Sequence, residues 1–266
     1  MKLEVLLSCM NQSDLSLIER SKLTGDVVVI NQCDKEDFFE GKTKNGRVRV
    51  FSTTERGLTK SRNMAIEKSD ADICLLCDDD EVFEEDYEQK IITAYEKLDL
   101  ADVIIFKMAN RAPSFKDKVM RLRFPKTLRV SSWQISFKKK SLEEKGVRFD
   151  TLLGAGSGNG AEEELKFLTD CEKAGLKIYY LPEEIASVER TDSTWFKGFD
   201  ATFFENRGAT TRYILGLWLS LLYAVYYVLR KRNEYKNDIS PCSAFYHILK
   251  GIKNNKITKQ KRSKSA

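Results

Sequence analysis

An acidic triplet follows an apolar run in the segment ICLLCDDDEVF, residues 73–83. The apolar run predicts a buried strand, and carboxylates at the carboxyl end of a strand lie where open α/β folds bind ligands. Asp78 and Asp80 are two residues apart, so both side chains can point to one side and bind a hard cation such as Mg²⁺ or Mn²⁺. Asp79 then faces the other way. A solvated acidic turn that begins a helix is the alternative.

A second acidic cluster follows a glycine-rich loop in GAGSGNGAEEELKFL, residues 154–168. Glu162, Glu163 and Glu164 fall in the first turn of a predicted helix, where a carboxylate can act as a general base. Acidic residues that complement the helix dipole are the alternative. The substring GSGNGA also fits the dinucleotide fingerprint, but three carboxylates at the helix start would repel a pyrophosphate, so we reject that interpretation.

Short apolar runs alternate with helical patterns through the first half of the chain, as in βαβ units. The expected strands lie at residues 3–9, 27–30, 47–51, 72–77 and 103–107, and the expected helices at residues 13–23, 60–67 and 84–98. Beyond these, we expect a strand at residues 129–137, a helix from about residue 161 to a Gly175 cap, and a strand at residues 177–181. The pattern predicts an α/β fold with a mostly parallel central sheet flanked by helices.

The segment GLTKSRNMAIEKSDADICLLCDDD, residues 57–80, resembles the nucleotide-binding half of GT-A glycosyltransferases, specifically the inverting family 2. The resemblance extends from residue 3 to about residue 190. It implies a Rossmann-like GT-A fold and transfer of a sugar from a nucleotide diphosphate donor, UDP above all, to a hydroxyl acceptor. The family's Asp-x-Asp motif falls on Asp78 and Asp80, which implies Mn²⁺ or Mg²⁺ as the cofactor.

The same resemblance assigns further site residues. The implied nucleotide-sugar contacts are Asn11, Asp34, Gly57, Arg62, Asp78 and Asp79. In this family a Glu-Asp pair stands three residues before an aromatic residue, and Phe167 sets that alignment here. Glu164 is then the expected general base, with Glu163 as its rival.

The C-terminal segment differs in charge from the rest of the chain. Residues 230–266 hold 11 Lys or Arg against Glu234 and Asp238, a net charge of +9, and the whole chain carries +5, so the first 229 residues carry −4. Such a tail is attracted to anionic lipid headgroups or to nucleic acid. We expect no nucleic-acid partner, because no recognition fold accompanies the tail.

Residues 213–229 carry no formal charge. As a helix they would be roughly 26 Å long, which is marginal for a bilayer span. We expect a helix in the membrane interface, with a buried helix and a spanning helix as the alternatives. The spacing of Gly216, Ser220 and Ala224 would also allow close approach of a second helix.

We therefore expect a GT-A domain at residues 1–205 and a helical, basic extension at residues 206–266. The expected location is cytoplasmic, at the inner face of the cell membrane, with a lipid-linked oligosaccharide of surface polysaccharide synthesis as the acceptor. A non-catalytic membrane-associated module is the alternative.

The remaining candidates predict little chemistry. The six cysteines follow no repeating spacing, which indicates reduced, packed thiols and a cytosolic compartment. Cys74 and Cys77 should point to opposite faces of their strand and cannot share a metal. The single histidine, His247, lies in the tail, so we expect no histidine-based mechanism. Trp195 and Phe196 could form an apolar platform for a sugar, or pack in the core.

Overall fold

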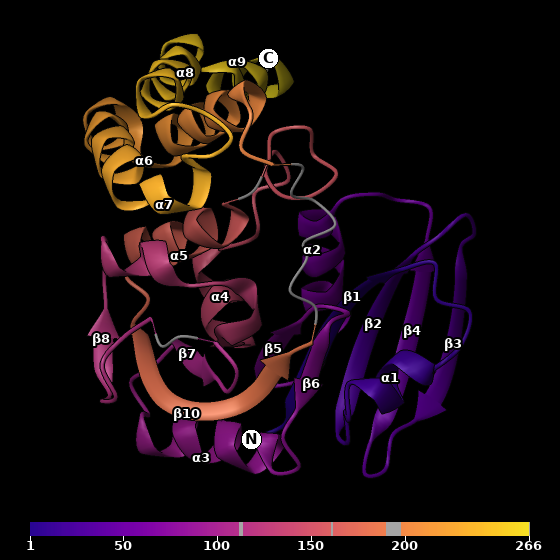
Figure 1. Ribbon diagram of the computed structural model, residues 1–266. Helices are drawn as coiled ribbons and strands as arrows, with labels where there is room; N and C mark the ends of the chain where they lie inside the picture. The colour runs from indigo at the N-terminus through magenta and orange to yellow at the C-terminus, as the bar shows by residue number, and fades with distance from the viewer. Residues whose placement is uncertain (112–113, 161, 190–197, 266) are drawn as a thin grey trace. The chain divides into compact units, whose positions relative to one another are not determined.

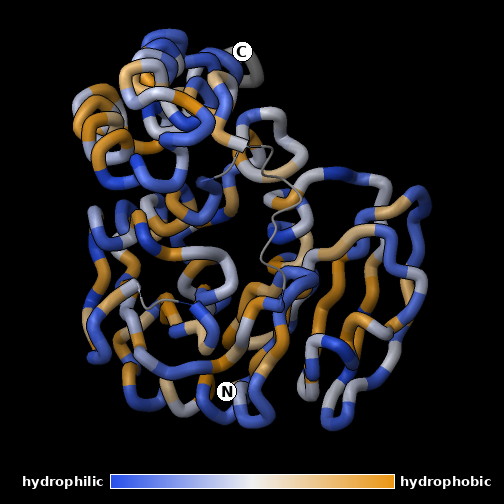
Figure 2. Tube along the Cα trace, viewed as in Figure 1, coloured by the Kyte–Doolittle hydropathy of each residue, from blue (hydrophilic) through white to orange (hydrophobic). Residues whose placement is uncertain are grey.

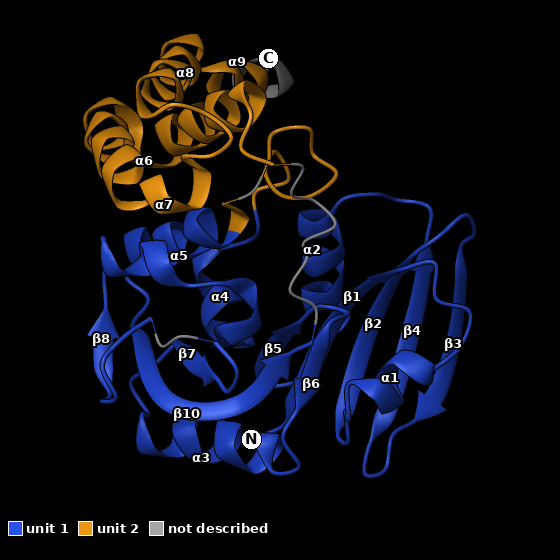
Figure 3. Cartoon of the chain, viewed as in Figure 1, with its two compact units in different colours: residues 1–149, 164–191 blue, residues 150–163, 192–266 orange. Residues whose placement is uncertain are grey.

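The computed structural model describes residues 1–111, 114–160, 162–189 and 198–265, so Trp195 and Phe196 lie outside the described residues. The chain forms two compact units (Figure 3): unit 1 is residues 1–149 and 164–191, and unit 2 is residues 150–163 and 192–266. The expected boundary between residues 205 and 206 falls inside a helix, α6 (Ala201–Arg230). The division into a catalytic domain and an extension stays a prediction.

Unit 1 is built on one mixed sheet, which contains ten strands within the described residues (Figure 1). Four neighbouring strands are parallel, in the order β4 (Arg47–Thr53), β2 (Asp26–Gln32), β1 (Leu3–Met10) and β5 (Ile73–Cys77). Next to β5, the order continues with β9 (Ile135–Lys138), β7 (Val103–Met108) and β10 (Ile178–Val188). Shorter strands complete the sheet: β3 (Asp37–Lys42), β6 (Glu81–Phe83) and β8 (Met120–Leu122).

The expected α/β class is confirmed, but the sheet is mixed rather than mostly parallel. β9 runs antiparallel to both of its neighbours, and β3, β6 and β8 are antiparallel to their partners. Only β7 and β10 add a further parallel pair to the four-stranded parallel block, within the described residues. The antiparallel strands are three to six residues long, too short to give a clear period in the sequence.

Helices cover both faces of this sheet. Along β5, Ile73, Leu75 and Cys77 contribute to one core, and Cys74 and Leu76 contribute to the other, so the expected opposite orientation of the two cysteines is confirmed. The first core receives α1 (Ser16–Arg20) and α3 (Tyr87–Lys97); the second receives α2 (Leu58–Lys68), α4 (Lys139–Lys145) and α5 (Glu163–Lys173). Burial on both faces explains why the central strands are mostly apolar, as the orange stretches of Figure 2 show.

Two of the expected strands differ from the structure. The strand expected at residues 129–137 is wrong over most of its length, because two 3-10 turns, η1 (Lys126–Arg129) and η2 (Ser132–Gln134), come before β9. Ser131 and Gln134 form a reciprocal capping box that fixes the second turn. β10 continues past residue 181 to Val188. Register shifts between Tyr180 and Glu184 bend the strand, and its far half pairs with β6 (Figure 1).

Unit 2 contains α6 and three shorter helices, α7 (Arg232–Tyr235), α8 (Pro241–Asn254) and α9 (Lys256–Ser265), in its described part. The backbones of α6 and α8 are in close contact. A Cβ atom on Gly208 would lie 2.1 Å from the carbonyl oxygen of Ile248, and one on Gly251 would lie 2.0 Å from that of Glu205. These two glycines therefore allow the helices to pack together.

Gly216 has a different role from the one expected. It bends α6, with φ +80° and ψ −178°, and a Cβ atom there would meet nothing within 4 Å. Ser220 and Ala224 are buried, but the glycine contacts that bring two helices together are at Gly208 and Gly251.

Among the described residues, α6 is the one helix long and apolar enough to cross a membrane, by length and composition. One third of its most apolar window (33%) is buried, so much of this surface is exposed. Within α6, the exposed large apolar side chains all follow Gly216: Leu217, Trp218, Leu219, Leu222, Val225, Tyr226 and Leu229.

Candidate active site

The carboxyl ends of the parallel strands meet at one edge of the sheet. Met10 of β1 pairs with Gln32 of β2, Gln32 pairs with Thr53 of β4, and Leu7 pairs with Cys77 of β5. The segments that leave these four strands are residues 11–12, 33–34, 54–57 and 78–80. They contain most of the expected donor contacts, and they lie where open α/β sheets bind ligands.

Arg62 is the central side chain of this edge. It extends from α2, is 1% exposed, and its Nη2 donates to both carboxylate oxygens of Asp78, at 3.0 and 3.2 Å. Asp78 also accepts a hydrogen bond of 2.9 Å from the hydroxyl of Ser132. A buried guanidinium requires such a carboxylate partner, so the structure brings together two residues that the resemblance assigned separately.

The same arginine lies beside the expected general base. Its Nη1 is 3.5 Å from Oε1 of Glu164, whose side chain is 17% exposed. The guanidinium lies 5.5 Å from the centre of the Phe149 ring, and Phe149 stacks on Phe167 with centroids 4.3 Å apart. Phe167 follows Glu164 by three residues in α5, so the stack orients the helix face that carries Glu164. Glu163 is 5% exposed.

Gly57 directly precedes α2 as its N-cap and has φ +127°, a conformation that favours glycine. Its amide donates to the side-chain oxygen of Gln32 at 2.7 Å, which ties the start of α2 to the end of β2. Asn63, next to Arg62, donates to the carbonyl of Phe149 and accepts from its amide, both at 2.9 Å. These contacts attach α2 to the end of β2 and to Phe149, and they therefore position Arg62.

Two of the expected nucleotide-sugar contacts, Asp34 and Asn11, lie at the outer part of this edge. The side chain of Asp34 is 98% exposed and is paired with Arg56 at 2.6 Å. Arg56 also donates to the carbonyls of Cys33 and Thr53 at 2.7 and 3.1 Å. Asn11 has φ +52°, is exposed, and its amide donates to the carbonyl of Gln32. An exposed carboxylate and amide leave this part open to a ligand.

Asp78 and Asp79, at the acidic end of β5, have different surroundings, and the expected shared side of Asp78 and Asp80 stays a prediction. Asp78 points to Arg62 on the α2 side, whereas Asp79 is exposed and lies near Cys9. Burial raises the pKa of Cys9 to about 12, with a smaller contribution from the charge of Asp79, so Cys9 is an inert thiol. Glu81 accepts from the Asp78 amide at 2.8 Å, and burial, followed by the charge of Asp78, raises its pKa well above the usual value.

The carboxylates at the end of β5 fit a hard cation that takes only one or two of its ligands from the protein. No group of three or more His, Cys, Asp or Glu in the described part of the chain is arranged to hold a metal ion. The carboxylate of Asp78 accepts from Arg62 and Ser132, yet a carboxylate has about four acceptor positions. One or two carboxylates plus substrate phosphates are a common Mg²⁺ site, so Asp78 and Asp80 remain suitable ligands.

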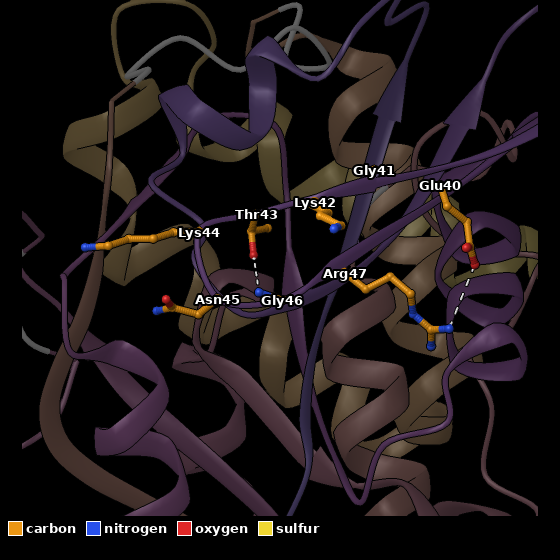
Figure 4. Close-up of a pocket in the computed structure, with 8 residues that line it drawn as sticks. All are labelled: Glu40, Gly41, Lys42, Thr43, Lys44, Asn45, Gly46 and Arg47. Atoms are coloured by element: carbon orange, nitrogen blue, oxygen red, sulfur yellow. Dashed lines mark hydrogen bonds and ion pairs between the residues drawn. The ribbon is translucent and has the colours of Figure 1, made fainter.

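A pocket of about 560 Å³ lies elsewhere, at the hairpin between β3 and β4, and its lining is the continuous segment of residues 40–47 (Figure 4). The Thr43 hydroxyl accepts from the Gly46 amide and Arg47 pairs with Glu40 across the hairpin. This hairpin precedes β4, so it lies at the opposite end of the parallel strands from Asp78. It contains none of the expected site residues.

The sequence interpretation did not include Ser132, Phe149 and Arg56. Ser132 was hidden by the wrongly expected strand at residues 129–137, in which a serine has no special position. Arg56 precedes Gly57 directly, so its place at the start of α2 was available as a signal. Phe149 carries no motif, and its contact with Arg62 depends on tertiary structure.

The sheet order and the helices on both faces define a GT-A fold. Residues 4–152, more than half of the chain, match Glycosyl transferase family 2, and the chain belongs to this family. It is therefore a glycosyltransferase, and a non-catalytic module is not retained as an alternative. No curated protein matches the chain significantly.

Solved structures of TarS from S. aureus share the fold. TarS 1-349 in complex with UDP-GlcNAc matches with a TM-score of 0.60 at 14% identity, over 90% of this chain and 74% of that chain. TarS 1-349 in complex with UDP matches with a TM-score of 0.53 at 16% identity, over 79% and 65%. TarS 1-349 also matches with a TM-score of 0.52 at 14% identity, over 79% and 65%. The chain thus spans less than two thirds of the length of two of these structures.

Proposed function

We propose that this glycosyltransferase moves a sugar from a UDP-linked donor to a hydroxyl of a lipid-linked oligosaccharide, by a single inverting displacement. The observation that supports this most strongly is the bridge that Arg62 makes between Asp78 and Glu164. It places a fixed positive charge between the proposed donor site and the proposed base. Fixed charge of this kind can stabilise the negative charge that develops on a departing diphosphate.

The donor would bind along the carboxyl edge of the parallel strands. In this proposal the nucleotide lies against Asn11, Asp34 and Asp79 in the open part of the edge, and Gly57 lets the backbone approach closely. The TarS complexes contain UDP-GlcNAc and UDP on a similar fold, which supports a UDP-linked donor. Asp78 and Asp80 would hold Mg²⁺ or Mn²⁺, which supplies Lewis-acid neutralisation of the diphosphate when bound.

Glu164 would act on the acceptor. Its carboxylate removes the proton of the acceptor hydroxyl while that oxygen forms a bond to the anomeric carbon. The bond from this carbon to the diphosphate oxygen breaks, and the electron pair leaves with UDP. Attack from the opposite side inverts the anomeric centre. Glu163 is the rival base, and its low exposure makes it the less accessible of the two.

The acceptor proposal depends on the second half of α6 and on the basic tail. Trp218, Leu222 and Leu229 are 77%, 67% and 72% exposed, which is unusual for large apolar side chains. Arg230, Lys231 and Arg232 follow directly. An exposed apolar face followed by positive charge fits an anionic lipid surface at the cytoplasmic side of the membrane.

Thermal unfolding with UDP and Mn²⁺ tests the donor site. A ligand at 100 times its Kd stabilises the folded state by about 2.7 kcal/mol, so a clear rise in Tm is expected. Asp80→Ala should remove most of the rise that depends on Mn²⁺. Asp99→Ala is the matched control, because Asp99 is exposed and lies between α3 and β7. A wild-type Tm that UDP and Mn²⁺ together leave unchanged would contradict the proposal.

Flotation with vesicles tests the membrane surface. Wild type should bind vesicles that contain phosphatidylglycerol and bind weakly to pure phosphatidylcholine, because the tail is cationic. The double change Leu222→Glu and Leu229→Glu should lower the bound fraction at least tenfold, given roughly 3 kcal/mol per charge placed in apolar lipid. Leu100→Glu is the control, because Leu100 is exposed in unit 1. Equal binding of all three proteins would refute lipid attachment through α6.

A further inference from the structure

Arg207 of α6 is held in an aromatic enclosure within unit 2. Its side chain is 15% exposed, and the guanidinium lies 4.5 Å from the centre of the Tyr227 ring and 5.0 Å from that of Phe203. Its Nη1 donates to the hydroxyl of Tyr223 at 2.9 Å. Phe203 precedes the bend at Gly216 and the two tyrosines follow it, so both halves of α6 enclose this one cation.

The charge partner of Arg207 is Glu162, which lies in the other segment of unit 2. The two side chains form a hydrogen-bonded ion pair, and that of Glu162 is 19% exposed. Burial alone would lower the pKa of Arg207, but the charge of Glu162 together with the two tyrosines, Tyr223 and Tyr227, outweighs it, and the pKa is raised. The arginine therefore remains charged, and the ion pair is a fixed link between α6 and the segment that ends at Glu163.

Glu162 has an unusual backbone conformation. Its φ is +82°, a region that residues other than glycine seldom adopt and that persists only where the surroundings hold it. Glu163, the next residue, begins α5. The direction in which the chain enters α5 thus depends on a strained residue whose side chain is held by Arg207.

Further contacts of α6 and α9 hold the segment before Glu162. Asn159 is 5% exposed, and its side-chain Nδ2 donates to the carbonyl of Leu152 and to the side-chain oxygen of Gln260, both at 2.9 Å. The hydroxyl of Thr210 donates to the carbonyl of Asn159 at 3.1 Å. Residues 152–160 are therefore a fixed element of unit 2 despite their glycine content.

We infer that Arg207 is a positioning residue for the transfer reaction: through Glu162 it sets the backbone that begins α5 and thereby the placement of the Glu164 carboxylate. The inference rests on the proposed function, in which Glu164 is the base. The donor contacts proposed above all belong to unit 1, whereas Arg207 acts along the chain through Glu162 and Glu163. A loss of this contact should therefore lower kcat and leave the donor KM unchanged.

The test compares Arg207→Gln, Arg207→Lys and Glu162→Gln with wild type. For Arg207→Gln and Glu162→Gln we expect kcat to fall about 10- to 100-fold, because small misplacements of a reacting group have effects of that size. The KM for the UDP-sugar and the stabilisation by UDP should stay within about twofold of wild type. Arg207→Lys keeps the charge and should recover kcat to within roughly tenfold of wild type. Arg212→Gln, on the same helix, is the control with unchanged kcat.

Amide hydrogen exchange gives a second readout that does not need activity. Peptides that cover residues 152–168 should exchange at least about tenfold faster in Arg207→Gln, and peptides of β5 should not change. If exchange at residues 152–168 is unchanged, or if kcat and donor affinity fall together, the inference is overturned while the proposed function stands. If wild type turns over no nucleotide sugar, the proposed function fails and the positioning role fails with it.

Discussion

Unit 1 and unit 2 each bury one arginine against carboxylate and aromatic side chains, and the two differ in charge balance. Arg62 faces two carboxylates, those of Asp78 and Glu164, at an edge where both are partly exposed. Arg207 faces one carboxylate, that of Glu162, inside an aromatic enclosure. The Arg207 pair joins one cation to one carboxylate. The Arg62 cluster brings two carboxylates to one cation, and it is the cluster that we propose as the place for chemistry.

The proposed base, Glu164, gives the largest expected effect in this comparison. Glu164→Gln keeps the shape and the contact with Arg62 but cannot accept a proton, so kcat should fall about 10²- to 10⁴-fold. Glu163→Gln, the neighbouring change, should lower kcat by less than about tenfold. Initial rates of sugar transfer measure both. If Glu163→Gln has the larger effect, the base assignment moves to Glu163, and Arg62 no longer links base and donor.

Removal of Arg62 tests whether its two carboxylate contacts matter for folding. Arg62→Ala removes the buried cation that contacts both Asp78 and Glu164, which should lower the free energy of unfolding by about 3 kcal/mol. Urea titration measures it. Lys60→Ala is the control, because on the same helix it removes a solvent-exposed pair with Glu55, which should contribute at most about 1 kcal/mol. Equal losses in the two variants would show that the Arg62 cluster is no more than a surface pair.

The smallest effect concerns a third cluster, in which one carboxylate has two basic partners. Glu205 of α6 accepts from Lys250 at 2.7 Å and contacts His247 at 2.9 Å, and the hydrogen bond from Lys250, then that from His247, lowers its pKa below 4.5. A lowered carboxyl pKa stabilises the fold above the unfolded pKa, and this contribution is lost as the pH falls through the folded value. The stability difference between wild type and Glu205→Gln should be about 0.5–1 kcal/mol at pH 7 and vanish in acid. Urea titrations of both proteins at the two pH values measure it, and a difference independent of pH would contradict the assignment.

The sequence predicted the parallel block of unit 1 well, because its strands are apolar on both faces and its helices are periodic. The expected strand at residues 72–77 and helix at residues 60–67 match β5 and α2 within two residues at each end. Gly175, the expected cap, has φ +85° after α5. The segment of residues 126–134 could not be predicted, because its turns are fixed by side-chain contacts such as the capping box of Ser131.

The candidate site was predictable as a set of residues but not as an arrangement. Spacing and resemblance selected Arg62, Asp78 and Glu164, which lie far apart in the sequence and adjacent in the structure. The salt bridges among them depend on how α2 and α5 pack on the sheet. Arg207 was not selected, because its surroundings come from Glu162 and from residues on both sides of a helix bend that no sequence pattern marks.

The path of the chain has a consequence for dissection of this enzyme. The polypeptide passes from one unit to the other after residues 149, 163 and 191, so unit 2 consists of two segments that are not continuous in the sequence. A truncation that removes everything after residue 197 would leave residues 150–163 behind without Gln260, Thr210 and Arg207. Unit 2 therefore cannot be exchanged between proteins by replacing the C-terminal helices alone. A chimera between relatives would have to carry this inner segment together with the C-terminal helices.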